Sequence, residues 1–228
     1  MKNSMIIIKK QLKDTLKNKT ILIQFILFPM ITIIMENTIQ MKGMPEHFFT
    51  NLFSVMYIGM APLTSVAAII AEEKEKNTLR VLLMANVKPW QYVMGVGIYV
   101  WSICMIGACV MATGLERQDV VVYLLVMAVG FVISILAGAC VGIYAKSQMN
   151  ATSIVMPVMM ILSFLPMLAM FNDKIEKVAK YFFTQQLKTC LNDMSVMGHS
   201  NETYIVIIVN LLIALIIFGL TFKKKGLE

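Results

Sequence analysis

Six long apolar stretches, separated by shorter polar segments, set the pattern of this 228-residue chain. A helix needs about 20 apolar residues to cross the hydrocarbon core of a bilayer, and each stretch is near or above that length. We therefore predict an all-α polytopic membrane protein with six transmembrane helices, organised as one domain over residues 1–228. The expected spans are residues 20–40, 51–71, 90–114, 120–145, 148–171 and 203–222.

Two segments outside the spans also show helical periodicity. Before the first span, four apolar residues recur among lysines: Met5, Ile8, Leu12 and Leu16. This pattern predicts an amphipathic interfacial helix over residues 1–19 that lies on anionic lipid, although a basic tail that only fixes orientation is an alternative. Apolar residues three to five apart predict a second amphipathic helix within 172–202, lying on the membrane or dipping into the mouth of the bundle.

The composition and charge distribution support a membrane location. Hydrophobic residues make up 58% of the chain and charged residues only 14%, which excludes an ordinary soluble domain. With the N-terminus inside, the inner segments hold 14 of the 20 Lys and Arg residues and five of the 13 acidic residues, a net +9 against −2 outside. The positive-inside rule then predicts a multi-pass protein of a bacterial cytoplasmic membrane with both termini cytoplasmic.

The spans themselves carry few specific signals. Four cysteines lack C-x-x-C spacing, and three of them lie within spans, so we expect neither a disulfide framework nor a metal site. Gly138 and Gly142 form a G-x-x-x-G pair that permits close helix contact. No Asp, Glu, Lys or Arg lies at mid-depth, which favours a hydrophobic or amphipathic cargo over a small ion.

The most informative segment follows the second span. An acidic and basic run over 72–76 precedes Thr78, which is placed to cap a short helix with leucines 79, 82 and 83 on one face. Leucines on a solvated loop cost free energy unless a partner covers them, so we expect a protein to dock there.

This segment resembles the membrane subunits of type-2 ATP-binding-cassette (ABC) exporters. In that family an acidic run after the second span leads into a T-L/E-x-L-L segment and a short turn before the third span. The residues in matching places are Glu72, Glu73, Glu75, Thr78, Leu79, Leu82, Leu83, Val87 and Gly95. The chain departs from many members at Asn86, where they have Pro, and at Val96, where they have Lys.

The resemblance implies a permease subunit that exports a peptide, a lipid-like molecule or a drug. It would pair with a second copy or a homologous permease, with cytoplasmic ABC ATPase subunits and with membrane lipid, but not with nucleic acid. No G-x-x-x-x-G-K-S/T phosphate loop occurs, so ATP and Mg²⁺ would belong to the ATPase, leaving this chain without cofactor, metal or catalytic residue.

The ATPase-coupling residues that the resemblance implies are Glu72, Glu73, Glu75, Thr78, Leu79, Leu82 and Leu83. In this interpretation the acids face polar groups of the ATPase and the leucines fill its groove. The alternative is that the acids form an ordinary solvated helix end with i,i+4 pairs such as Glu72 to Lys76.

Two other functions are weighed against this interpretation. An intramembrane protease with an E-E-x-x-x-R signature is disfavoured, because Asn77 replaces the arginine and both histidines, His47 and His199, are expected at the outer surface. A stand-alone channel or secondary transporter usually needs ionisable groups deep in the bundle, which the spans lack.

Overall fold

The computed structural model describes residues 2–39, 45–84, 87–194 and 201–225, and these residues form helices and no strand. The α-helices are α1 (Lys2–Lys17), α2 (Lys19–Thr38), α3 (Phe48–Glu75), α4 (Thr78–Met84), α5 (Pro89–Met111), α6 (Arg117–Tyr144), α7 (Gln148–Leu168), α8 (Asp173–Ala179), α9 (Phe183–Asn192) and α10 (Asn201–Lys225). A short 3₁₀ helix, Ala112–Gly114, follows α5.

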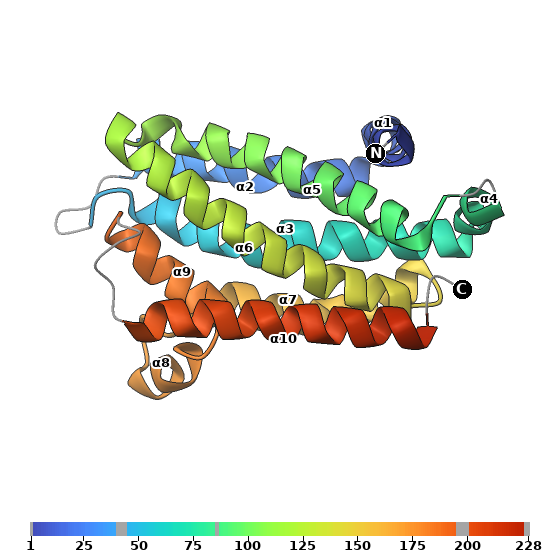
Figure 1. Ribbon diagram of the computed structural model, residues 1–228. Coiled ribbons are helices and arrows are strands. Elements are labelled where there is room, and N and C mark those ends of the chain that lie inside the picture. Colours follow the sequence, from blue (N-terminus) through green and yellow to red (C-terminus); the bar gives the residue numbers. More distant parts are fainter. Residues whose placement is uncertain (1, 40–44, 85–86, 195–200, 226–228) are drawn as a thin grey trace.

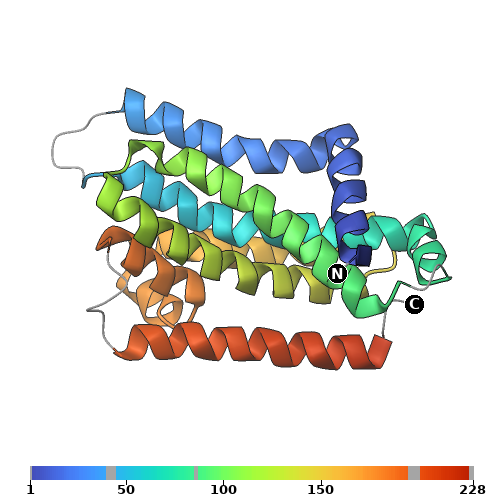
Figure 2. The same cartoon turned by 45° about the horizontal axis from the view of Figure 1, so that its top comes forward.

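Six of the described helices are long and apolar enough to cross a membrane, namely α2, α3, α5, α6, α7 and α10. They run alongside one another in a bundle, and α1 lies across their direction (Figures 1 and 2). The predicted all-α fold with six transmembrane helices is therefore confirmed. Both termini, α1 and α4 lie at one end, which we call the basic end, while α8 and α9 lie at the opposite, far end (Figure 1).

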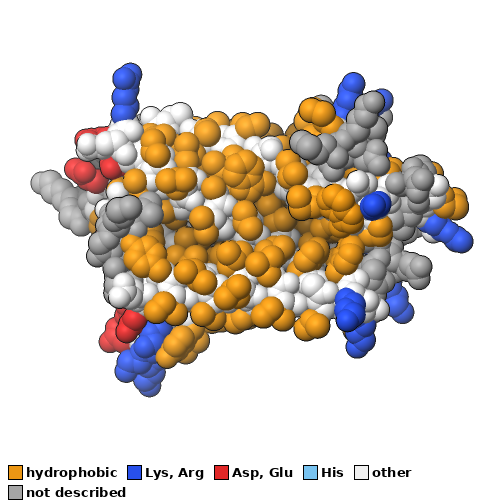
Figure 3. Space-filling model, in the orientation of Figure 1, with side chains coloured by type: hydrophobic (Ala, Val, Ile, Leu, Met, Phe, Trp, Pro, Cys, Tyr) orange, Lys and Arg blue, Asp and Glu red, His pale blue; other side chains and the backbone are white. Residues whose placement is uncertain are grey.

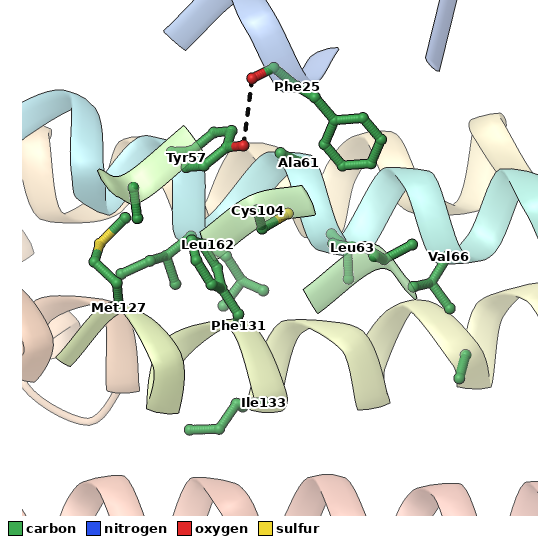
Figure 4. Packing of buried hydrophobic residues seen from close by; sticks show 14 of the residues in the cluster. Phe25, Tyr57, Ala61, Leu63, Val66, Cys104, Met127, Phe131, Ile133 and Leu162 are labelled. Atoms are coloured by element: carbon green, nitrogen blue, oxygen red, sulfur yellow. Dashed lines mark hydrogen bonds between the residues drawn. The ribbon is translucent and has the colours of Figure 1, made fainter. Parts of the chain in front are cut away.

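Helix α3 forms the centre of the bundle. In its apolar stretch 78% of the residues are buried, against none in the corresponding stretch of α10. Tyr57 of α3 packs edge-on against Phe131 of α6, with ring centroids 5.6 Å apart, and its hydroxyl donates to the carbonyl of Phe25 in α2 at 3.3 Å (Figure 4). Tyr57 therefore joins α2 and α6 to the central helix α3.

The G-x-x-x-G pair lies where α6 comes close to α3. A Cβ added at Gly138 would collide with the carbonyl oxygen of Leu63, and one added at Gly142 would lie 2.8 Å from the Cβ of Ile70. Because a backbone carbonyl cannot rotate away as a side chain can, only glycine fits at Gly138 without moving a helix.

The segment between α7 and α10 forms two helices rather than the single one expected. Asn172 caps α8 by accepting from the backbone N–H of Lys174 at 2.9 Å. Helix α9 turns three apolar residues into the bundle, where they are buried: Phe183, Leu187 and Leu191. Helix α9 is therefore packed against the spans through these three side chains.

Helix α1 packs on the bundle through one face and leaves another open. Ile7, Gln11 and Thr15, spaced four apart, are buried, whereas Met5 and Leu12 remain 74% and 50% exposed. The side chain of Leu16 lies outside the described residues. Gly95 of α5 makes room for this packing, since a Cβ there would lie 3.0 Å from Cγ2 of Ile7.

Candidate functional site

The expected coupling segment forms a sharp corner between α3 and α4. Asn77 adopts a left-handed backbone conformation (φ 55°), which asparagine tolerates better than most residues, and its N–H donates to the carbonyl of Lys74 at 3.0 Å. Thr78 begins α4, and its hydroxyl donates back to the carbonyl of Glu73 at 3.2 Å. Thr78 therefore ties α4 to α3 instead of capping α4 with its side chain.

Leu79 and Leu82 of α4 pack against the bundle, so the expectation that the leucines face solvent is wrong for Leu79. Leu79 is only 2% exposed and Leu82 is half-buried against the same apolar core, while the side chain of Leu83 lies outside the described residues. The physical reason is that the spans of the same chain already offer apolar cover, which removes the cost of exposing leucine to water.

The opposite face of α4 carries an exposed apolar pair that the sequence reasoning missed. Val81 and Met84, three residues apart, are 60% and 74% exposed, and Arg80 beside them is exposed as well. Residues three apart share a helix face. The same periodicity that groups the leucines therefore groups these two residues on the side away from the core.

Glu73 forms its ion pair and hydrogen bonds with residues of the same chain. Its side chain is only 9% exposed, and Oε1 accepts from Nζ of Lys10 at 2.7 Å and from Nε2 of Gln11, both on α1. A buried carboxylate is costly unless it is paired and hydrogen-bonded, and these two donors satisfy its Oε1. Glu73 thus fastens the end of α3 to α1.

Glu72 and Glu75 also find partners in the chain. Glu72 pairs with Lys76, as the sequence alternative expects, and accepts from Nδ2 of Asn18 at 3.2 Å. The hydrogen bond from Lys76 to Glu72 and the charge of that carboxylate raise the pKa of Lys76. Glu75 accepts from the backbone N–H of Gln148 at 2.8 Å, at the start of α7.

One further contact widens this network. Nζ of Lys74 donates to the carbonyl of Ile143 near the end of α6, at 2.7 Å. Helices α1, α6 and α7 are therefore all joined to the last turn of α3, just before the corner. Between α1 and this turn lies a cavity of about 730 Å³, whose polar lining includes Lys10, Gln11, Asp14, Thr15, Asn18, Glu72, Glu73, Lys76 and Thr78.

The arrangement offers mechanical linkage between helices. Within the described ranges, no three His, Cys, Asp or Glu side chains are grouped so as to hold a metal ion. His47 lies at the start of α3, where Nδ1 is 3.7 Å from Oε1 of Glu36. At 1.5 Å per residue, roughly 37 Å of helix separates His47 from Glu72. His199 lies outside the described residues.

The left-handed residue at the corner gives a first testable expectation. Asn77→Val should lower the stability of the purified protein by about 1–2 kcal/mol, because a β-branched side chain clashes with its own backbone in this conformation. Asn77→Gly is the matched control and should melt at or above the wild-type temperature. Equal melting of the two variants in a thermal unfolding assay would contradict a left-handed corner.

The comparisons with known proteins agree with the architecture. The search of curated proteins gave no match. A family model described as "ABC-2 family transporter protein" matches residues 2–223, which covers nearly the whole chain and includes all six long apolar helices apart from the last residues of α10. On this match, the chain belongs to the ABC-2 family of membrane transport proteins.

Proposed function

We propose that this chain is the permease subunit of an ATP-driven ABC exporter in the cytoplasmic membrane. The family match and the six apolar helices support a membrane transport component, and the sequence contains no phosphate loop of its own. ATP and Mg²⁺ would act on partner ATPase subunits, and a second permease copy or a homologous permease would complete the membrane part. The whole chain would serve as one permease domain.

The basic end would face the cytoplasm in this proposal. It carries the lysine-rich α1, the charged corner before α4 and the lysines at the end of α10. In the space-filling view the visible acidic side chains gather at the far end beside several Lys and Arg, only Lys and Arg are visible among the charged side chains at the basic end, and an apolar belt lies between (Figure 3). This distribution supports cytoplasmic termini through the positive-inside rule.

The single observation that carries the proposal is the exposed pair Val81 and Met84 on α4. An apolar pair held at a fixed corner outside the spans is suited to fill an apolar groove on a partner. In this proposal the ATPase contacts Val81 and Met84, not the leucines and acids expected from the sequence. Leu79 is buried against the spans, and Glu72, Glu73 and Glu75 are hydrogen-bonded within the chain.

A displacement of α4 would be transmitted to the bundle through the hydrogen bonds made by the last turn of α3. Glu73 is hydrogen-bonded to α1, Lys74 to α6 and Glu75 to the start of α7, at distances of 2.7 or 2.8 Å. A short helix tied to several spans passes on a push as a rigid-body shift. We infer that ATP-driven displacement of α4 alters the packing of these helices together.

The cargo would be a hydrophobic or amphipathic compound, such as a peptide, a lipid-like molecule or a drug. In the described spans the Asp, Glu, Lys and Arg side chains lie toward the ends, including Glu36 in α2 and Glu72, Glu73, Lys74 and Glu75 in α3. A pathway between such helices offers apolar and weakly polar side chains to its cargo, which suits an apolar molecule better than an ion.

The docking surface can be tested with the double variant Val81→Asp, Met84→Asp. Two carboxylates in an apolar contact should weaken association with the co-expressed cognate ATPase at least tenfold, or about 1.4 kcal/mol. Co-purification and permease-stimulated ATP hydrolysis measure this loss.

Two controls separate docking from folding. Val178→Asp changes an equally exposed valine (55%) on α8 at the far end and should leave the ATPase bound. Leu79→Asp buries a charge and should instead lower the thermal stability of the permease itself. Wild-type ATPase recovery with the double variant would remove α4 as the docking element.

A further inference from the structure

An apolar groove of about 560 Å³ lies between α5, α6 and α10 near the basic end. This volume falls within the range of roughly 300–1,000 Å³ that is typical of ligand pockets. Its lining consists of apolar and aromatic residues and one glycine, including Trp90, Gly97 and Trp101 of α5 and Phe222 of α10. The hollow is visible on the apolar face in Figure 3. The corner and α4 do not contribute to it.

The groove has the depth of one membrane leaflet. It extends along α5 from Trp90 to Trp101, roughly 16 Å at 1.5 Å per residue, which is about half of a hydrocarbon core near 30 Å. The indole Nε1 of Trp101, at its inner limit, donates to the carbonyl of Ala128 at 3.3 Å. A chain-like apolar ligand from one leaflet matches this length, whereas a packed helix needs a contact along a whole span.

At the shallow end of the groove, lysines flank the lining residues of α5 and α10 in the sequence. Lys88 precedes Trp90 by two residues, and Lys223 and Lys224 directly follow Phe222; all three lysines are exposed. Exposed lysines at the membrane surface attract anionic headgroups. A second copy of this chain placed here in the same orientation would bring its own lysines against these, so charge complementarity favours an anionic lipid.

We propose that this groove binds an anionic phospholipid from the leaflet at the basic end, with one acyl chain against Gly97 and the headgroup beside Lys88, Lys223 and Lys224. Helix α10 is the least buried span, and Phe218 and Phe222, whose ring centroids are 5.7 Å apart, face the groove from it. The bound acyl chain fills the space between α10 and α5 and holds α10 in the bundle.

The tryptophans supply a direct readout, because the chain has only two and both line the groove. Purified protein is titrated with phosphatidylglycerol carrying brominated acyl chains, or with phosphatidylcholine carrying the same chains, and tryptophan quenching is recorded. Phosphatidylglycerol should quench at a mole fraction about 100-fold lower. Replacing the three lysines with glutamine should remove this preference, since each lysine near an anionic lipid contributes roughly fivefold.

Gly97 allows the groove to be filled without disturbing the core. A Cβ there would lie 3.4 Å from Cγ2 of Ile135, an ordinary contact, so Gly97→Ala is the folded control. Gly97→Leu places a side chain in the groove and should reduce quenching by phosphatidylglycerol at least fivefold at equal protein stability. Equal quenching by both lipids in the wild type overturns the proposal. A Gly97→Leu variant that is quenched like the wild type also overturns it. So does a Gly97→Leu variant that no longer forms a dimer but still binds lipid.

Discussion

Gly138→Leu is expected to leave almost no folded protein in detergent extracts of the membrane. The position faces the carbonyl oxygen of Leu63, with which even a Cβ would collide. One turn further along α6 there is no space for a larger side chain either, because Gly142 is in contact with Ile70 and Ala67. Overpacking of a core costs about 1–3 kcal/mol for a small insertion, which is the loss we expect for Gly138→Ala. A leucine adds three more carbons at the same point and should exceed the few kcal/mol by which most proteins are stable.

The control for this expectation is Gly219→Leu on α10. A Cβ at Gly219 has no heavy atom within 4 Å, so the larger side chain should project into open space beside the helix and leave the melting temperature unchanged. Size-exclusion profiles and thermal unfolding of the two leucine variants give the comparison. A Gly138→Ala protein that melts together with the wild type would show that α6 and α3 do not cross this closely.

The six spans could be predicted from the sequence because a single physical length governs them. The hydrocarbon core requires long uninterrupted apolar helices, and each such stretch is visible without knowledge of any neighbour. The G-x-x-x-G spacing likewise indicates a close contact. That its partner is the backbone of α3 at Leu63 depends on the three-dimensional packing, which no local pattern contains.

The site was predicted less well, for reasons that Leu79 and Glu73 illustrate. Periodicity groups Leu79 with its neighbours on one face of α4, but it does not say whether a partner protein or the same chain covers that face. The carboxylate of Glu73 binds Lys10, 63 residues earlier, whereas sequence spacing reveals only the local pair of Glu72 with Lys76. The burial of Leu79 and the pairing of Glu73 both depend on contacts between residues that are far apart in the sequence.

The break between α8 and α9 shows a third kind of limit. No glycine or proline marks residues 180–182, so one continuous amphipathic helix was expected there. The chain instead turns at this point, which lets Phe183 and Leu187 enter the mouth of the bundle. A Cβ added at Gly130 would lie 2.8 Å from Cδ1 of Leu187, so α9 packs closely against α6, a tertiary contact that no local sequence pattern contains.

Glu73→Ala is expected to release α1 from the end of α3 and to lower the stability of the protein by about 2–3 kcal/mol. Hydrogen bonds to charged groups contribute about 1.5–3 kcal/mol, and this carboxylate accepts from Lys10 at 2.7 Å and from Gln11. Gln11 is only 3% exposed, so water replaces the lost acceptor poorly. Glu73→Gln keeps an acceptor oxygen and should lose less.

Lys76→Ala provides the matched control, because it removes the neighbouring pair with Glu72 on the exposed side of the same helix. Exposed i,i+4 pairs contribute about 0.3–0.5 kcal/mol, so this variant should melt close to the wild type. Two readouts then separate a general loss of stability from release of α1: the melting temperature, and the rate of tryptic cleavage after the exposed Lys9 and Lys13.

The charge exchange Lys10→Glu with Glu73→Lys provides the sharpest test of this link. Each single change places like charges where the 2.7 Å pair now lies, and should speed cleavage of α1 more than Glu73→Ala does. The double change restores opposite charges and should recover part of the protection, because Lys10 and Glu73 interact directly. If the double variant were no better protected than the two single variants, or if Glu73→Ala were cleaved at the wild-type rate, the attachment of α1 would rest on Ile7 and its apolar neighbours instead. The corner would then have no firm connection to α1 through which α4 could move it.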